Sequence, residues 1–163
     1  MLLKWFFLLH IVFLLPMYSQ ELTDPEAKVA AVSIISTFTT WPTYKCGELR
    51  VGFVGSPSKY FMDAIGSRSK KYPVKWIPLR WSEVDAAKID VLYVCDDIFF
   101  PQVVPPGVLT ISDAPLFAER GGMVHIFLNE HQHLRLSINL RVVLKSGLKI
   151  DSKVLKLAKI VEI

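Results

Sequence analysis

Two short, almost continuous apolar runs constrain this fold more than any other feature of the chain. Residues 49–55 (LRVGFVG) and 89–95 (IDVLYVC) each carry a single charged residue. Such runs are typical of parallel strands, which are buried on both faces of a sheet. Because parallel neighbours need a crossover connection, the chain must return over the sheet between them, usually as a helix. The sequence therefore favours alternating strands and helices around a parallel sheet.

The neighbouring segments have the spacing that such a layer needs. Residues 26–40 carry apolar residues three and four apart, which predicts a helix with Asp24 as N-cap, Pro25 in the first turn and an end at Trp41-Pro42. We expect a second helix that Ser56-Pro57 begins and Gly66 ends as a left-handed cap, with one apolar face formed by Tyr60, Phe61, Ala64 and Ile65.

Shorter elements fill the middle of the chain. Residues 74–79 (VKWIPL) predict a strand, and Pro78 places it at a sheet edge because proline cannot donate to a ladder. A short helix is expected over 81–87, a helical or irregular crossing over 97–104, and a fourth strand over 108–111. Strands that recur with helices between them at this interval are typical of a doubly wound α/β layer.

The pattern changes after residue 122. Residues 123–129 and 133–139 alternate apolar and polar positions around 130–132, which predicts a β-hairpin. One face of it carries Val124, Ile126, Leu128, Leu134, Leu136 and Ile138, and the other Met123, His125, Phe127, His133, Arg135, Ser137 and Asn139. Two helices are expected after it: 140–146, capped by Asn139 and stopped by Gly147, and 153–161, capped by Asp151-Ser152. The predicted fold is a three-layer α/β/α sandwich whose mostly parallel sheet ends in an antiparallel hairpin.

The N-terminus resembles a secretory signal peptide. Residues 1–19 place Lys4 before an apolar run, 5–15, and a helix-breaking Pro16. That run is shorter than the roughly 20 residues that span a bilayer as a helix. We expect cleavage after Ser19 and a single exported domain over residues 20–163, with an uncleaved membrane anchor as the alternative.

The charge of the mature chain argues against a nucleic-acid-binding protein, and the positions of its cysteines argue against a disulfide. Cleavage of the signal peptide removes one charged residue, Lys4, and leaves 18 Lys and Arg against 15 Asp and Glu. The resulting net charge of +3 is too mild for a nucleic-acid-binding surface. Export exposes Cys46 and Cys95 to oxidation, but the predicted strands place them roughly 20 Å apart. A disulfide needs Cα atoms within about 7 Å, so we expect no bridge unless loop 42–48 folds over the sheet.

No residue set indicates a catalytic or metal centre. His131 and His133 lie at the hairpin tip, and His125 is too far back to complete the three or four ligands of a zinc site. Asp96-Asp97 follows the predicted central strand, where α/β folds place ligands, although capping of the next helix is the simpler interpretation. Dinucleotide, phosphate-loop, hydrolase-elbow and zinc-protease motifs are missing from the sequence. We therefore expect no enzyme activity, no cofactor and no metal.

Several ordered motifs carry a resemblance to a known family. They are Phe38-Thr39-Thr40-Trp41-Pro42, residues 49–55, Ser112-Asp113-Ala114-Pro115, Phe117-Ala118, Gly121-Gly122-Met123, residues 134–140, residues 146–155 and Leu157-Ala158-Lys159-Ile160-Val161. Together they resemble the YfiR family over essentially the whole mature chain. The resemblance implies a periplasmic regulator without chemistry of its own. Such a regulator docks on the periplasmic domain of an inner-membrane signalling protein, a diguanylate cyclase or a sensor kinase, and represses its output. Better-known members of that family carry cysteine pairs whose oxidation tunes stability. Cys46 and Cys95 are not matched to those pairs, so the resemblance does not extend to redox control.

We expect the recognition surface in two segments. The loop supplies Ser112, Asp113, Gly121, Gly122 and Met123, and the hairpin supplies His125, Phe127 and Arg135. Maintenance of the fold is the alternative role for all eight, because Asp113 can cap a turn ending near Arg120 and the glycine pair can reverse the chain with positive φ.

Two other functions stay open. One is a periplasmic small-ligand sensor that uses a crevice near Gly55, Ser56, Asp96 and Ser112. The other is a hydrolase that depends on Asp96 or Asp113. A homodimer is also possible, and no nucleic acid or direct membrane contact is expected.

Overall fold

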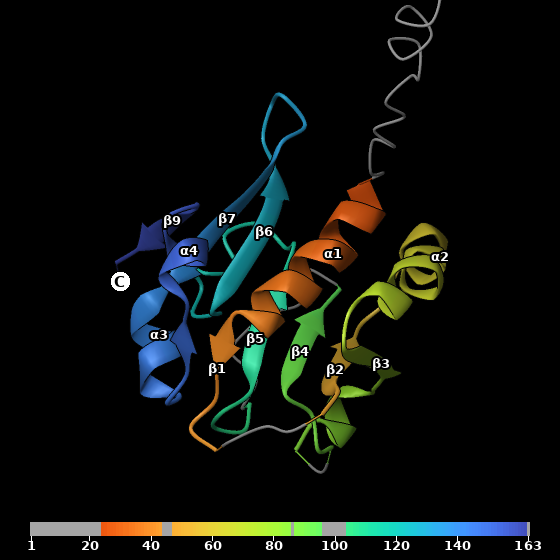
Figure 1. Ribbon diagram of the computed structural model, residues 1–163, viewed down its shortest axis with the longest axis horizontal. Helices are drawn as coiled ribbons and strands as arrows, with labels where there is room; N and C mark the ends of the chain where they lie inside the picture. The colour runs from red at the N-terminus through yellow and green to blue at the C-terminus, as the bar shows by residue number, and fades with distance from the viewer. Residues whose placement is uncertain (1–23, 44–46, 86, 96–103, 163) are drawn as a thin grey trace, which may run out of the picture.

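A computed structural model describes residues 24–43, 47–85, 87–95 and 104–162 (Figure 1). A seven-stranded sheet, ordered β3-β2-β4-β5-β6-β7-β9, forms its centre. Its strands are β2 (Leu49–Val54), β3 (Val74–Pro78), β4 (Val91–Val94), β5 (Leu109–Ser112), β6 (Val124–Leu128), β7 (Leu134–Asn139) and β9 (Ala158–Val161). All neighbours pair in parallel except β6 and β7, which form the expected hairpin. The predicted α/β fold with a mostly parallel sheet is confirmed.

The five parallel strands are wound in two directions from their centre. Their order in the sheet is β3-β2-β4-β5-β6. The strand that comes first in the sequence, β2, therefore lies between the second, β3, and the third, β4. This is a common doubly wound order, and its winding reverses between the strands here called β2 and β4. Ligands of such sheets bind beyond the carboxyl ends of the strands at that reversal point.

The helices lie mainly on one face of the sheet. They are α1 (Asp24–Thr37), α2 (Lys59–Arg68), α3 (Leu140–Lys145) and α4 (Ser152–Leu155), with 3-10 turns η1 (Ser69–Lys71) and η2 (Trp81–Glu83). In Figure 1, α1 crosses the front of the sheet with α2 beside it. A two-stranded antiparallel sheet joins β1 (Thr39–Thr40) at the end of α1 to β8 (Lys149–Ile150).

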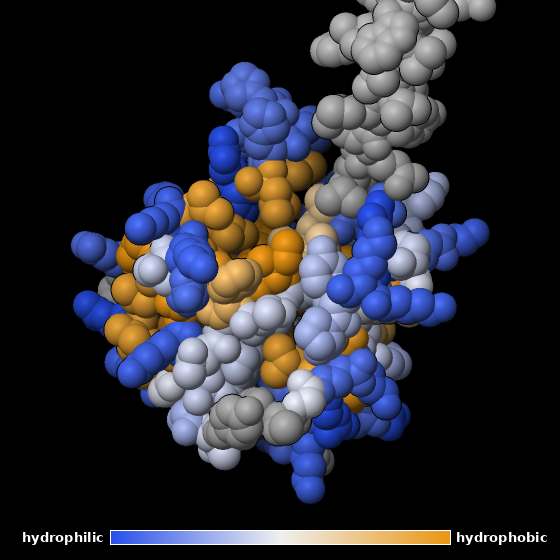
Figure 2. All heavy atoms as spheres, viewed as in Figure 1, coloured by the Kyte–Doolittle hydropathy of each residue, from blue (hydrophilic) through white to orange (hydrophobic). Residues whose placement is uncertain are grey.

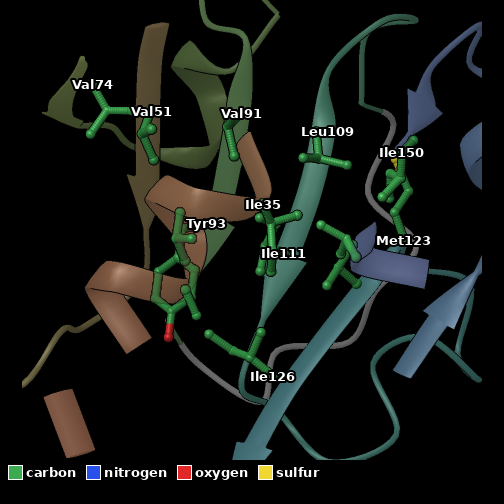
Figure 3. Packing of buried hydrophobic residues seen from close by; sticks show 14 of the residues in the cluster. Ile35, Val51, Val74, Val91, Tyr93, Leu109, Ile111, Met123, Ile126 and Ile150 are labelled. Carbon is green, nitrogen blue, oxygen red and sulfur yellow. The ribbon is translucent and has the colours of Figure 1, made fainter. Parts of the chain in front are cut away.

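Alternate residues of the central strands enter two separate hydrophobic cores. Val91 and Tyr93 of β4 belong to the larger core beneath α1, whereas Leu92 and Val94 belong to a smaller one on the opposite face. Figure 3 shows the larger core, where Ile35 of α1 lies among side chains from β4 and β5. In the described residues, η2 and the turn at Phe117 cover the smaller core. Burial on both faces explains why the strand 89–95 contains so few polar residues.

Several predicted helix boundaries are wrong. α1 ends at Thr37, because Thr39 and Thr40 pair with β8 instead of continuing the helix. Asp24 lies within α1 and does not precede it. The cap of α2 is Ser58, whose Oγ accepts a hydrogen bond of 3.1 Å from the Phe61 amide, and not Ser56-Pro57.

The predicted end of α2 is also wrong, since Gly66 lies inside a helix that continues to Arg68. Its φ is not positive, so Gly66 is not a left-handed cap.

The predicted C-terminal helix is the largest error. Only Ser152–Leu155 is helical, and Ala158–Val161 becomes β9, which pairs in parallel with β7. An unpaired β7 edge would leave backbone donors and acceptors without partners, and β9 satisfies them. Leu157, between the short helix and the strand, is 76% exposed.

Other local predictions are confirmed. Asn139 Oδ1 accepts from the Val142 amide at 3.2 Å, Asp151 Oδ1 accepts from the Lys153 amide at 2.7 Å, and Gly147 has a φ of +76°. β3, with Pro78, lies at the sheet edge as expected. Among the described residues, no helix is long and apolar enough to cross a membrane. Several predictions fall outside the described part of the chain. They are the signal peptide over residues 1–19, Cys46, Asp96-Asp97 and the predicted crossing over 97–104, of which only residue 104 is described.

Candidate functional site

A pocket of about 210 Å³ lies where the winding of the sheet reverses. Ser56 follows β2, Cys95 follows β4 and Asp113 follows β5, so the carboxyl ends of three parallel strands contribute to its wall. The remaining lining residues come from the starts of α1 and α2 and from the core: Asp24, Pro25, Lys28, Pro57, Ser58, Phe61 and Tyr93. This is the position at which doubly wound folds hold ligands.

A half-buried ion-pair network connects α1 to the end of β5 in this pocket. Lys28 Nζ lies 2.8 Å from Asp113 Oδ2 and 3.1 Å from Asp24 Oδ2, and the Lys28 side chain is only 17% exposed. Burial lowers the pKa of Lys28, but hydrogen bonds and charge attraction to Asp113 and Asp24 outweigh it and leave that pKa above its usual value. Lys28 is therefore fully charged at neutral pH and holds both carboxylates in place.

Tyr93 forms the inner wall of the pocket. Its ring is stacked on Phe61 with 5.0 Å between centroids, and the residue is 2% exposed. Burial, together with the charge of Asp113 and a hydrogen bond to it, raises the pKa of Tyr93 well above its usual value. The phenol therefore stays protonated and acts as a donor.

The chemistry of this pocket suits binding. It combines one cation, two carboxylates, the hydroxyls of Ser56, Ser58 and Tyr93, and an aromatic wall. None of its described lining residues is a histidine, so that lining does not contain a cysteine–histidine or serine–histidine pair for nucleophilic catalysis. Among the described residues, no group of three His, Cys, Asp or Glu side chains could hold a metal ion.

Most of the predicted loop residues shape this edge of the sheet. The Ser112 side chain is completely buried; its Oγ donates to the Val94 carbonyl at 2.7 Å and accepts from the Ala114 amide at 3.0 Å. Ser112 thus holds the turn, while the Asp113 carboxylate pairs with Lys28. Gly121 has a φ of +97°, as predicted, whereas Gly122 does not have positive φ. Met123 is 4% exposed and belongs to the larger core.

The three predicted hairpin residues lie on the other face of the sheet from α1. His125 is opposite Ser137 and stacks on Phe127 with 4.9 Å between ring centroids. Phe127 is opposite Arg135, which is exposed. Burial lowers the pKa of His125, although Glu119 and Asp113 oppose this change, so its imidazole is neutral at neutral pH. The structure places the eight predicted residues in different surroundings: Asp113 lines the pocket, and His125, Phe127 and Arg135 form the hairpin face. Of the other four, Ser112, Gly122 and Met123 are buried and Gly121 is exposed.

Sequence reasoning missed two features, the ion pairs of Lys28 and a second pocket. The second pocket, of about 310 Å³, lies at the end of α1 and is lined by hydroxyl side chains that include Ser36, Thr39 and Thr43. The run of serines and threonines before Trp41 was the available signal. Lys28 gave none, because a lysine on a helix is usually a solvated surface residue.

Two solved structures are similar to this chain, and the first of them supports the α/β fold. A conserved domain protein from Vibrio cholerae O1 biovar El Tor is similar with a TM-score of 0.57 and 15% sequence identity, over 86% of this chain. An ABC domain from Streptococcus pneumoniae, solved in complex with L-Trp, has a TM-score of 0.48 and 13% identity over 84% of this chain. The chain spans 60% of the length of each of these proteins.

A comparison with curated proteins found no match. The model of the YfiR/HmsC-like family matches residues 25–159, which include all four α-helices except Asp24 and every strand up to the middle of β9. The chain therefore belongs to the YfiR/HmsC-like family.

Proposed function

We propose that this protein is a periplasmic regulatory binding protein. It docks on the periplasmic domain of an inner-membrane signalling protein, a diguanylate cyclase or a sensor kinase, and represses or tunes its output. The observation that carries this proposal is the family match over residues 25–159, which covers almost the whole described domain. Family membership favours a regulator over an enzyme, and the pocket chemistry described above agrees with a binding role.

Repression by binding needs no chemistry in the regulator. A protein that binds the inactive state of a sensor more tightly than its active state shifts the population toward the inactive state by the ratio of the two affinities. The hairpin face is a suitable contact because Phe127 and Arg135 are of residue types that are enriched at protein–protein interfaces.

Capture from the cell envelope tests this proposal. The tagged protein is cross-linked in its own host, purified, and the captured proteins are identified by mass spectrometry. We expect one membrane protein with a periplasmic sensor domain and a cytoplasmic cyclase or kinase. Arg135→Glu should reduce that capture at least tenfold and raise the partner's output. Lys75→Glu, an equal charge change at an exposed position of the edge strand β3, should change neither. Capture of the protein alone, where a known envelope pair is recovered, would contradict the proposal.

The pocket of about 210 Å³ at the reversal of the winding, which we call the switch-point pocket, favours a second candidate function. This candidate is a small-ligand sensor. The polar lining of the switch-point pocket and its position beyond β2 and β4 suit a small polar molecule. Thermal shift with a set of amino acids, amines and nucleotides tests it, because a ligand at a hundredfold excess over its Kd stabilises the fold by about 2.7 kcal/mol. A true ligand should stabilise the wild type and not a Ser56→Tyr variant, whose larger side chain occupies the pocket. Equal stabilisation of both proteins would place the binding elsewhere.

A further inference from the structure

The positive charge of this protein is concentrated at its C-terminal end. Residues 140–163 contain six cations, Arg141, Lys145, Lys149, Lys153, Lys156 and Lys159, and two acids, Asp151 and Glu162, for a net +4. The whole chain has 19 cations and 15 acids, so residues 1–139 have 13 of each and no net charge. The mild overall charge therefore conceals a strongly basic segment.

The fold brings these cations to one edge of the molecule. All six side chains are exposed. Five of them come from α3, α4, β8 and β9, and Lys156 directly follows α4, next to the sheet edge that β9 forms. Figure 2 shows long hydrophilic side chains standing among apolar ones over α3, α4 and β9. This edge lies across the sheet from β3.

Exposed apolar side chains occur among the cations. Leu144 is 54% exposed, Leu157 76% and Ile160 38%. Phe38, at 38% exposure, adjoins them, because Lys153 Nζ lies 6.0 Å from the centre of its ring. We call these four apolar residues and five of the cations the basic–apolar face; Lys159 is left out, because it pairs with Ser137 and so points, like His125, away from α1.

We propose that the basic–apolar face docks this protein on the surface of a bilayer that contains anionic phospholipids. Lysines attract an anionic surface, while large apolar side chains between them enter the boundary between headgroups and acyl chains. The long lysine side chains keep their charge in the headgroup layer when the leucines are inserted. The proposal is independent of the proposed regulatory function.

The shape of the face favours a bilayer over a protein partner. Tight protein interfaces are built around pockets that receive aromatic or arginine anchors. None of the four pockets described for this structure is lined by a residue of α3, α4, β8 or β9. Exposed leucines among lysines, outside those four pockets, suit a fluid surface that adapts to them.

Co-sedimentation with vesicles tests this proposal. The protein is purified from the cell in its processed form, and its binding to vesicles of phosphatidylcholine alone is compared with binding to vesicles that contain one third phosphatidylglycerol. We expect binding to the anionic vesicles only, and loss of that binding in 0.5 M salt, where the Debye length falls to about 4 Å.

Matched variants locate the binding surface. Neutralising one lysine near an anionic surface should weaken binding about fivefold. The triple variant Lys145→Gln, Lys153→Gln, Lys156→Gln should therefore weaken it on the order of a hundredfold. The control triple variant Lys70→Gln, Lys71→Gln, Lys75→Gln makes the same change of charge at exposed positions near the opposite sheet edge and should have little effect.

An apolar pair completes the design. Leu157→Ser should weaken vesicle binding about tenfold, since the leucine no longer enters the bilayer. Tyr60→Ser, at a residue 75% exposed on α2, should not. All variants share the same N-terminus, so any contribution from it cancels. Equal losses in the two lysine triples, binding to phosphatidylcholine alone, or no binding to anionic vesicles would each overturn the proposal.

Discussion

Gly122 illustrates how one residue without a side chain holds the turn before the hairpin. A Cβ atom built at this position would lie 2.2 Å from the Phe117 ring, which is itself 3% exposed in the smaller core. Close approach to Phe117, and not positive φ, is therefore what this glycine provides.

Two glycine substitutions should have opposite effects on stability. We expect Gly122→Ala to lower the free energy of unfolding by about 1–3 kcal/mol, because the added methyl overpacks the core. Gly66→Ala should raise it by about 0.5–1 kcal/mol, since Gly66 lies inside α2 with open space around its Cβ position. Urea denaturation measures both, and a neutral Gly122→Ala would show that Phe117 can move away.

His125 should make stability depend on pH. Its pKa is lowered in the folded protein by burial, against the opposing attraction of Glu119 and Asp113, so the native state binds this proton more weakly than the unfolded chain. The stabilisation is fully present above the unfolded pKa of about 6.5 and is lost as pH falls below it.

Urea denaturation between pH 7.5 and 5 measures this contribution. We expect His125→Gln to lose less stability over this interval than the wild type. His131→Gln, whose side chain is 72% exposed, should follow the wild type. Identical slopes for His125→Gln and the wild type would mean that His125 is solvated.

At the scale of elements, Lys28 fastens α1 to the carboxyl end of β5. Lys28→Met keeps the length of the side chain but leaves Asp113 without its cation, so we expect a loss of about 1–2 kcal/mol. Arg80→Met removes the exposed ion pair with Glu83 and should cause no measurable change, because solvent screens such pairs. Chemical denaturation monitors both variants, and an unchanged Lys28→Met would show that the network contributes no net stability.

At the scale of the whole molecule, the sheet separates three surfaces. The switch-point pocket lies beyond the carboxyl ends of β2 and β4, the hairpin face carries His125 and Phe127 on the side away from α1, and the basic–apolar face lies along β9. A regulator that docks beside a membrane could use the hairpin face and the basic–apolar face at the same time. A ligand in the switch-point pocket would contact Lys28 and Asp113, which connect α1 to β5. Its binding would therefore strengthen or weaken the connection between α1 and β5.

The sequence alone determined the elements that depend on local pattern. The buried strands β2 and β4, the β6–β7 hairpin with its two faces, and the caps at Asn139 and Asp151 were predictable because periodicity and short polar side chains act within a few residues. The family resemblance rested on the same ordered motifs and was confirmed.

Tertiary structure decided what depends on distant partners. Residues 158–161 have a helical apolar spacing, yet they form β9 because β7 offers an unpaired edge, and Thr39-Thr40 leave α1 because β8 lies beside them. The Lys28–Asp113 contact joins residues 85 positions apart, so no local pattern could reveal it. The same reason separated the predicted recognition residues: neighbours in a strand point to opposite faces, and only the assembled sheet shows what covers each face.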